Sequence, residues 1–164
     1  ENDGVYIAGH TRGDLNITNK PGHFDNFVQK YSAEGNLEWS LLIGTASIEQ
    51  GIAAAANPAG QLYFVGWTTG ALAGVNAGDY DIILSSINPN GTIAWKQQFG
   101  SSKNDNAMAM ATGSDESIYI TGFTSGSLNN QPNLGKTDIF LSRLNQYGNL
   151  IWTRQLGGIG DDHA

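Results

Sequence analysis

The sequence predicts an all-β chain built from about three tandem copies of one four-stranded repeat, and three observations lead to this class. Trp39, Trp95 and Trp152 recur at spacings of 56 and 57 residues. Short apolar runs alternate with turn-forming glycines, of which the chain has 22. No segment has the apolar periodicity and length of a convincing helix.

The same offsets of 56 and 57 residues align further positions along the chain. They superimpose four sets of three residues: glycines after the third strand, aspartates before it, glycines after the tryptophan, and acids a few residues later. These positions are Gly35, Gly91 and Gly148; Asp25, Asp81 and Asp138; Gly44, Gly100 and Gly157; and Glu49, Asp105 and Asp162. Agreement at so many positions in one register predicts a structural repeat.

Each repeat is expected to form four short strands. The first is small and apolar, the second carries a tyrosine, the third alternates, and the fourth ends on the tryptophan. The expected first strands are 53–56 and 107–111; the second are 5–9, 62–66 and 118–122; the third are 27–31, 82–87 and 139–144; and a fourth is 37–39. The dipeptide Asn90-Gly91 favours a tight hairpin turn between the third and fourth strands.

Tandem four-stranded units of this length favour the radial arrangement of a β-propeller, with antiparallel blades. A strand of small residues suits the crowded centre, and a strand with tryptophan suits the outside. The chain is therefore interpreted as one propeller segment over 1–164. Its approximate repeats are 1–50, which lacks a first strand, 51–106, and 107–164, whose last residues begin a further blade.

Three blades do not close a ring, because propellers usually have four to eight. Two explanations are open. The chain is an excerpt of a longer array, or two copies pair as a homodimer into a six-bladed ring, each supplying part of the other's missing strand.

Composition excludes several classes of function. The formal net charge is −7, with 8 basic and 15 acidic residues and no visible basic patch, which argues against nucleic-acid binding. The absence of cysteine excludes disulfides and cysteine-based zinc sites. No apolar run approaches 18 residues, so no membrane span is expected.

A family resemblance follows from these motifs. The pattern is G-x-x-x-x-D-x-A, then a tyrosine strand ending in Gly-aromatic-Thr, then G-x-x-D, then G-x-x-x-W. It resembles the bacterial SBBP (seven-bladed β-propeller) repeat, three times over nearly the whole chain. The matching segments are 157–164, 119–124, 135–138 and 148–152, and one copy departs with Glu49 and Gly51. The resemblance implies an exported or cell-surface bacterial protein, and it transfers no catalytic residues.

One aromatic position recurs in kind: His10, Trp67 and Phe123 each follow the glycine that ends the second strand. Such a set can stack on sugar rings, with nearby polar loops supplying hydrogen bonds. The alternative is packing between neighbouring blades, which we favour.

The acids that precede strands also have two readings. Asp25, Asp81 and Asp138 are expected to bond backbone N–H groups in Asx-type turns. They are also the tentative ligands of a Ca²⁺ ion, because this hard cation prefers oxygen. Glu49, Asp105 and Asp162 are expected to anchor a turn or the neighbouring blade. Ca²⁺ is the one cofactor considered.

The sequence favours a non-enzymatic exported scaffold that binds a protein or glycan partner through its loops. A lectin-like propeller is the alternative, and a polysaccharide-processing enzyme is a further one. Nucleophile-elbow, P-loop and H-E-x-x-H motifs are absent from the sequence, so no catalytic residue is named.

Overall fold

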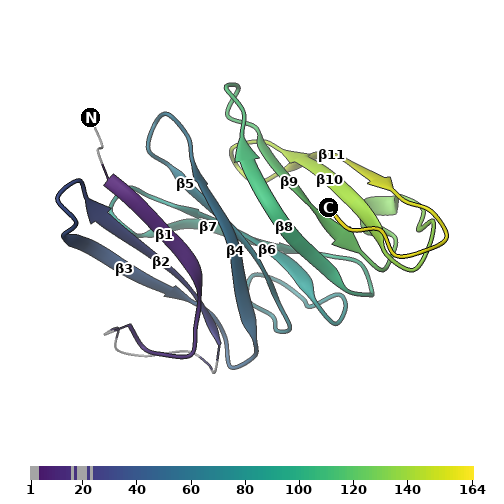
Figure 1. Ribbon diagram of the computed structural model, residues 1–164, viewed down its shortest axis with the longest axis horizontal. Helices are drawn as coiled ribbons and strands as arrows, with labels where there is room; N and C mark the ends of the chain where they lie inside the picture. Colours follow the sequence, from purple (N-terminus) through teal and green to yellow (C-terminus); the bar gives the residue numbers. More distant parts are fainter. Residues whose placement is uncertain (1–3, 16, 18–21, 23) are drawn as a thin grey trace.

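The computed structural model describes residues 4–15, 17, 22 and 24–164. Within these residues, eleven strands form three open antiparallel sheets, each with its strands in sequence order (Figure 1). The first sheet contains β1 (Gly4–Thr11), β2 (Asp25–Ser32) and β3 (Leu37–Ile43). The middle sheet contains β4 (Glu49–Ala56), β5 (Leu62–Thr68), β6 (Asp81–Ile87) and β7 (Ile93–Phe99). The third contains β8 (Asp105–Thr112), β9 (Ile118–Thr124), β10 (Asp138–Leu144) and β11 (Leu150–Leu156). The all-β prediction is confirmed, and one 3₁₀ turn, η1 (Leu128–Asn130), interrupts the loop before β10.

The fourth strands are longer than predicted, and the prediction that they end on the tryptophan is wrong. Trp39 is the third residue of β3, which continues to Ile43. The reason is pairing, because β2 offers partners along the whole segment, from Lys30 opposite Trp39 to Asn26 opposite Ile43. The second strands likewise extend beyond their predicted ends to include the aromatic position and the threonine after it.

The predicted hairpin glycines have the backbone that a tight turn requires. Gly35, Gly91 and Gly148 have φ of 83°, 83° and 80°, a region that other residues adopt only with strain. In each turn the glycine N–H donates to the residue three positions earlier, as from Gly91 to the carbonyl of Asn88 at 2.9 Å.

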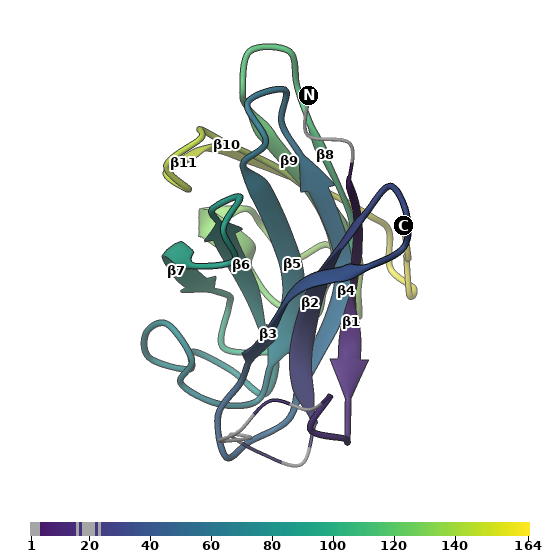
Figure 2. The same ribbon diagram turned by 90° about the vertical axis from the view of Figure 1, so that its left-hand side faces the viewer.

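The three sheets stand in a row, with β4 next to β1 on one side and next to β8 on the other (Figures 1 and 2). We call the side of each sheet that carries Tyr6, Tyr63 or Tyr119 its tyrosine face, and the other side its aliphatic face. Side chains alternate between the two faces along each strand. The tyrosine faces of the first and middle sheets pack on the aliphatic faces of the middle and third sheets, respectively.

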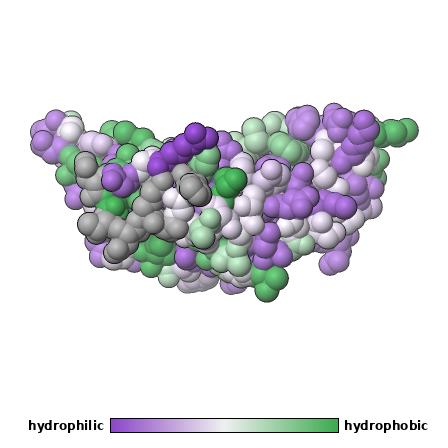
Figure 3. Space-filling view, turned by 90° about the horizontal axis from the view of Figure 1, so that it is seen from below, coloured by the Kyte–Doolittle hydropathy of each residue, from purple (hydrophilic) through white to green (hydrophobic). Residues whose placement is uncertain are grey.

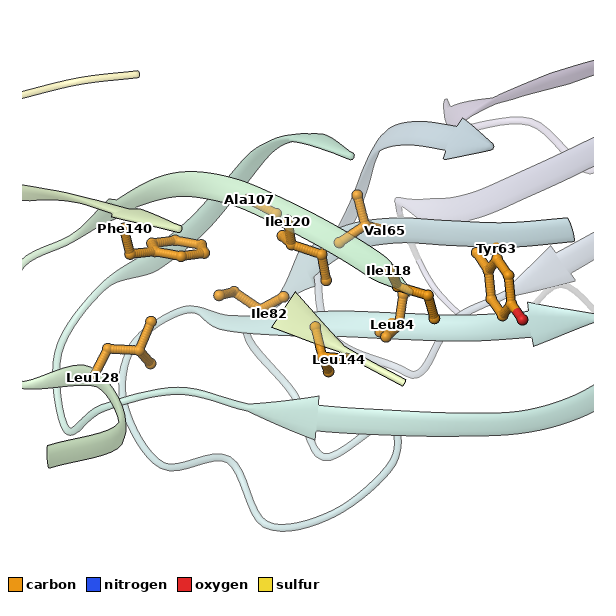
Figure 4. Close-up of a cluster of buried hydrophobic side chains, with 10 residues drawn as sticks. All are labelled: Tyr63, Val65, Ile82, Leu84, Ala107, Ile118, Ile120, Leu128, Phe140 and Leu144. Atoms are coloured by element: carbon orange, nitrogen blue, oxygen red, sulfur yellow. The ribbon is translucent and has the colours of Figure 1, made fainter. Parts of the chain in front are cut away.

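Two hydrophobic clusters fill these contacts. Between the first and middle sheets, Val28 and Ile43 meet Leu62, Phe64 and Ile87. Figure 4 shows the second cluster, whose residues are Tyr63, Val65, Ile82, Leu84, Ala107, Ile118, Ile120, Leu128, Phe140 and Leu144. The core of this protein therefore lies between sheets, and the middle sheet contributes to both clusters.

The face of the row that is seen from below is mixed in polarity. Hydrophilic and intermediate residues make up most of the coloured part of this face, with hydrophobic residues between them in small groups (Figure 3). The part of the chain that the structure describes contains no helix with the length and apolar character needed to cross a lipid bilayer.

Candidate functional site

The aspartates that open the third strands are buried and anchor the loops before them. Asp25, Asp81 and Asp138 are each 0% exposed. The Oδ2 atom of Asp81 accepts the backbone N–H of Ala77 at 2.7 Å. The corresponding donors are Gly22 at 3.2 Å and Leu134 at 2.6 Å. The predicted bonds to nearby backbone N–H groups are present, but the donors precede the aspartates by three or four residues. An Asx-type turn would use a backbone N–H that follows the aspartate, so the type of turn differs from the prediction.

A glutamine of the fourth strand supports this loop in two of the three sheets. Gln98 Nε2 donates to Asp81 Oδ2 at 2.9 Å, and Gln155 Nε2 donates to Asp138 Oδ2 at 2.8 Å. Leu42 occupies this position in the first sheet, so Asp25 has no such donor.

The second set of acids bridges a turn to the neighbouring strand. Asp105 accepts the backbone N–H and the hydroxyl of Ser101 at 2.5 and 2.9 Å, and the hydroxyl of Thr124 at 2.5 Å. Glu49 makes matching bonds with Thr45 and Thr68. Burial raises the pKa of the Asp105 carboxyl, and the negative charge of Asp81 adds a smaller effect in the same direction.

At three places a glycine lies between the aspartate that opens a third strand and the acid that follows later in the chain, at the next sheet where there is one. A Cβ atom on Gly100 would overlap Asp81 Oδ1 and lie 3.0 Å from Asp105 Oδ2. Gly44 and Gly157 stand in the same relation to their own pair of acids. The carboxylates lie against the glycine backbone, and any larger residue would displace them.

The Oδ1 atoms of Asp25, Asp81 and Asp138 are buried, and none has a hydrogen-bond partner among the described residues. These three aspartates are the tentative Ca²⁺ ligands, but they lie in three separate sheets. The described residues include no group of three or more acidic or histidine side chains arranged to hold a metal ion.

The aromatic set is distributed over the three sheets, one residue at the end of each second strand. His10 Nε2 lies 3.3 Å from the side-chain nitrogen of Gln50 in the middle sheet. The rings of Trp67 and Tyr80 meet edge to face with centroids 4.8 Å apart. Phe123 meets the His163 ring at 4.6 Å. The structure therefore gives each member of the set a local partner and does not bring the three together in one pocket.

Trp39 and Trp95 each lie beneath the hairpin of the following sheet. The Trp39 indole N–H donates to the Pro89 carbonyl at 3.0 Å. A Cβ on Gly91 would lie 2.8 Å from the Trp39 ring, and one on Gly148 would lie equally close to Trp95. These turn glycines are therefore needed for a close approach between sheets as well as for their positive φ.

A groove of about 330 Å³ opens between the middle and third sheets, and sequence reasoning did not find it. It lies by the hairpins at 57–61 and 113–117, which rise at the upper edge of Figure 1. Its lining combines three aromatic rings, three side-chain amides and a carboxylate. These residues are Tyr63, Trp95 and Tyr147; Asn57, Gln61 and Gln146; and Glu116.

Two small residues of the middle sheet leave room for this groove. Ser86 lies between Tyr63 and Trp95 in the strand register, and Ala94 precedes Trp95. In the first sheet the same two places hold Lys30 and Glu38, which form a salt bridge of 2.8 Å. This departure from the repeat, beside a tryptophan present in every copy, is the signal by which the sequence could have indicated the groove.

Several polar groups of the groove are available to a ligand. Within the described residues, the Glu116 carboxylate, the Gln146 amide and the Trp95 indole N–H have no hydrogen-bond partner, whereas the Trp39 indole N–H is bonded. The pKa of the Tyr63 hydroxyl is raised mainly by burial, and to a smaller extent by the negative charge of Glu116.

Glu116 also has an unusual backbone. Its φ is 62°, and the equivalent residue in the preceding sheet is Gly60, with φ of 82°. A residue with a side chain therefore occupies a position where glycine is less strained.

The sequence matches no protein-family model, and no curated protein matches it.

Proposed function

We propose that this chain is a segment of an SBBP-type β-propeller and acts as a non-enzymatic binding scaffold for a protein or glycan partner. The observation that carries the proposal is that one sheet-to-sheet interface is formed twice with equivalent residues. A row of sheets related by one repeated interface is what a radial array requires.

The equivalence extends to individual side chains. Tyr6 and Ala8 of the first sheet pack against the cluster that contains Leu62 and Phe64. One repeat later, Tyr63 and Val65 take the places of Tyr6 and Ala8 in the second cluster. Their partners Ile118 and Ile120 take the places of Leu62 and Phe64.

Each end of the row presents one half of this interface without its partner. Val5 and Ile7 on the aliphatic face of the first sheet are 61% and 46% exposed, whereas their equivalents Leu62 and Phe64 are 1% and 0% exposed. The tyrosine face of the third sheet carries a hollow of about 240 Å³, lined by Ala109, Met110, Ala111, Tyr119, Thr121 and Leu141. These two faces are complementary in kind, so each is suited to another sheet of the same repeat.

The scaffold role follows from how the loops are held. The loops before β6 and β10 differ in sequence, yet a buried aspartate anchors both in the same way. A rigid frame with variable loops is the usual way in which proteins present a binding surface. An exported or cell-surface bacterial location rests on the family resemblance alone.

The oligomeric state of the chain tests the proposal. Light scattering over a range of concentrations should give about twice the chain mass of 17.4 kDa if two copies form a six-sheet ring. Ile7→Lys should then abolish the dimer, because a lysine would be placed in the buried interface. Val75→Lys is the control, because Val75 is 87% exposed in a loop.

An assembly that survives Ile7→Lys would contradict the interface. A monomer at every concentration would reject the two-copy ring in favour of a longer array. In that case a chain extended by its neighbouring repeats should cover Val5 and Ile7, and hydrogen exchange at β1 should slow.

A lectin-like function is the second candidate, and the groove between the middle and third sheets favours it. The set His10, Trp67 and Phe123 supports it less well, because each of these residues already has a local partner.

A further inference from the structure

We propose that the groove between the middle and third sheets binds a neutral saccharide, with one sugar ring lying against Trp95 and Tyr147. The inference goes beyond the scaffold role and does not depend on ring closure, because both sheets belong to this chain. Its location differs from the aromatic set at the ends of β1, β5 and β9.

The aromatic rings supply the apolar part of such a site. Tyr147 is 65% exposed at the tip of its hairpin, and Trp95 lies beside Tyr63 with ring centroids 6.0 Å apart. A pyranose ring has one face of C–H groups that suits an aromatic plane, and tyrosine and tryptophan add a polar tip to a flat apolar surface.

The polar groups fit hydroxyls, which both donate and accept hydrogen bonds. The Gln146 amide offers both functions, the Glu116 carboxylate accepts, and the Trp95 indole N–H donates. None of these three groups has a hydrogen-bond partner among the described residues. The volume of about 330 Å³ falls within the range of ligand pockets, roughly 300–1,000 Å³.

The charge of the groove selects against anions. None of its lining residues is lysine or arginine, and the chain carries a formal charge of −7. At the equivalent place in the first sheet Lys30 and Glu38 form an ion pair and Trp39 is bonded to Pro89. In the middle sheet, by contrast, both of these places hold small residues and the Trp95 indole N–H has no hydrogen-bond partner among the described residues.

The strained residue is a second, independent indication. Glu116 has φ of 62° where the preceding repeat has glycine. Strained residues of this kind cluster at ligand-binding and active sites, and the Glu116 side chain lines the groove.

Titration of the ¹⁵N-labelled chain with glucose, galactose, cellotriose and maltotriose tests the proposal. We expect shifts of the Trp95 indole and of the amides of Gln61, Glu116 and Gln146, with a dissociation constant on the order of 1 mM. Glucuronate should bind more weakly than glucose, because its carboxylate faces Glu116.

The variants Tyr147→Ala and Glu116→Gln should each weaken binding about tenfold or more, a loss typical of removing one ring or one hydrogen-bonded charge. Glu34→Gln is the matched control, since it makes the same change in an exposed turn of the first sheet. Trp95→Ala is avoided because Trp95 packs beneath Gly148.

Three results would overturn the proposal. The first is that none of the four sugars, at tens of millimolar, changes the NMR signals of the groove residues. The second is binding that both groove variants leave intact. The third is binding that Trp67→Ala abolishes while the groove variants do not.

Discussion

The middle and third sheets have the same strand pattern, but they are buried differently. In β6 of the middle sheet all seven residues are buried, and in β5 six of seven are. In β9 and β10 of the third sheet, buried and half-exposed residues alternate strictly. The difference arises because the middle sheet has a neighbour on both faces and the third sheet has one only on its aliphatic face.

This comparison shows that the stabilising unit is the contact between sheets. A single sheet of this repeat has two apolar faces and no core of its own, so its stability depends on its neighbours. Residues at equivalent positions should therefore contribute very different amounts to the free energy of unfolding.

The largest effect is expected at Phe64, which is 0% exposed between the first and middle sheets. Phe64→Ala should lower the free energy of unfolding by about 3–5 kcal/mol, because it removes a buried ring and leaves a cavity. Ile7→Ala, at the equivalent position on the exposed face of the first sheet, should cost less than about 1 kcal/mol in the monomeric chain, at concentrations where no assembly forms. Urea denaturation of both variants measures the difference. Equal losses would show that Ile7 is covered in solution.

A second prediction concerns the glycine between the two buried acids. Gly100→Ala should destabilise the protein by about 2–3 kcal/mol, because the new methyl group would overlap the Asp81 carboxylate. Gly158→Ala is the control, since a Cβ there meets no atom within 4 Å. The midpoint of thermal unfolding reports both. A neutral Gly100→Ala would mean that the Asp81 side chain moves freely, contrary to its burial.

Two aspartates of the third sheet should respond to pH with opposite signs. Burial raises the pKa of Asp105, so its share of stability is complete below the unfolded value of about 3.9 and is lost as pH rises through the folded pKa. Hydrogen bonds from the Ser117 backbone and hydroxyl, and then Arg143, lower the pKa of Asp115. The contribution of Asp115 to stability is therefore present above the pKa of the unfolded chain and is lost as the pH falls through the lower folded pKa.

Urea unfolding between pH 3 and pH 7 measures this contrast, a range that spans the ordinary aspartate pKa of about 3.9. The free energy of unfolding of the unsubstituted chain, measured relative to that of the Asp105→Asn variant, should increase toward low pH. Measured relative to that of the Asp115→Asn variant, it should decrease. Parallel trends in the two variants would contradict the difference in burial.

The smallest effect is expected at the hairpin before β9. Glu116→Gly should leave stability unchanged or raise it by about 0.5 kcal/mol, because the backbone strain is relieved and partly offset by the flexibility of glycine when unfolded. Gly60→Glu, the reverse change in the middle sheet, should cost about 1 kcal/mol. Chemical denaturation at neutral pH compares them. A clear loss in Glu116→Gly would indicate that the Glu116 side chain stabilises the fold.

Much of the fold could be predicted because its signals are local. The positive φ of Gly35, Gly91 and Gly148 follows from hairpin chemistry within four residues. The ends of the strands were harder to predict, because β3 continues past Trp39 only where β2 provides hydrogen-bond partners. The sequence also predicted acidic residues at the starts of strands. It did not predict that the carboxylates of Asp81 and Asp105 both lie against Gly100.

The groove could not be predicted because no sequence motif marks the residues on either of its two sides. Ser86 and Ala94 are ordinary residues in a strand, and they matter only because a hairpin of the next sheet closes over Trp95.

The sequence alone determined the class of secondary structure and the turn residues, since these depend on neighbours a few positions apart. Tertiary structure decided which faces are buried, why a glycine separates the two acids, and where a ligand-sized space remains. Those features depend on contacts between sheets, which join residues far apart in the chain, as with Trp39 and Pro89, which are 50 positions apart, and no local pattern encodes those contacts.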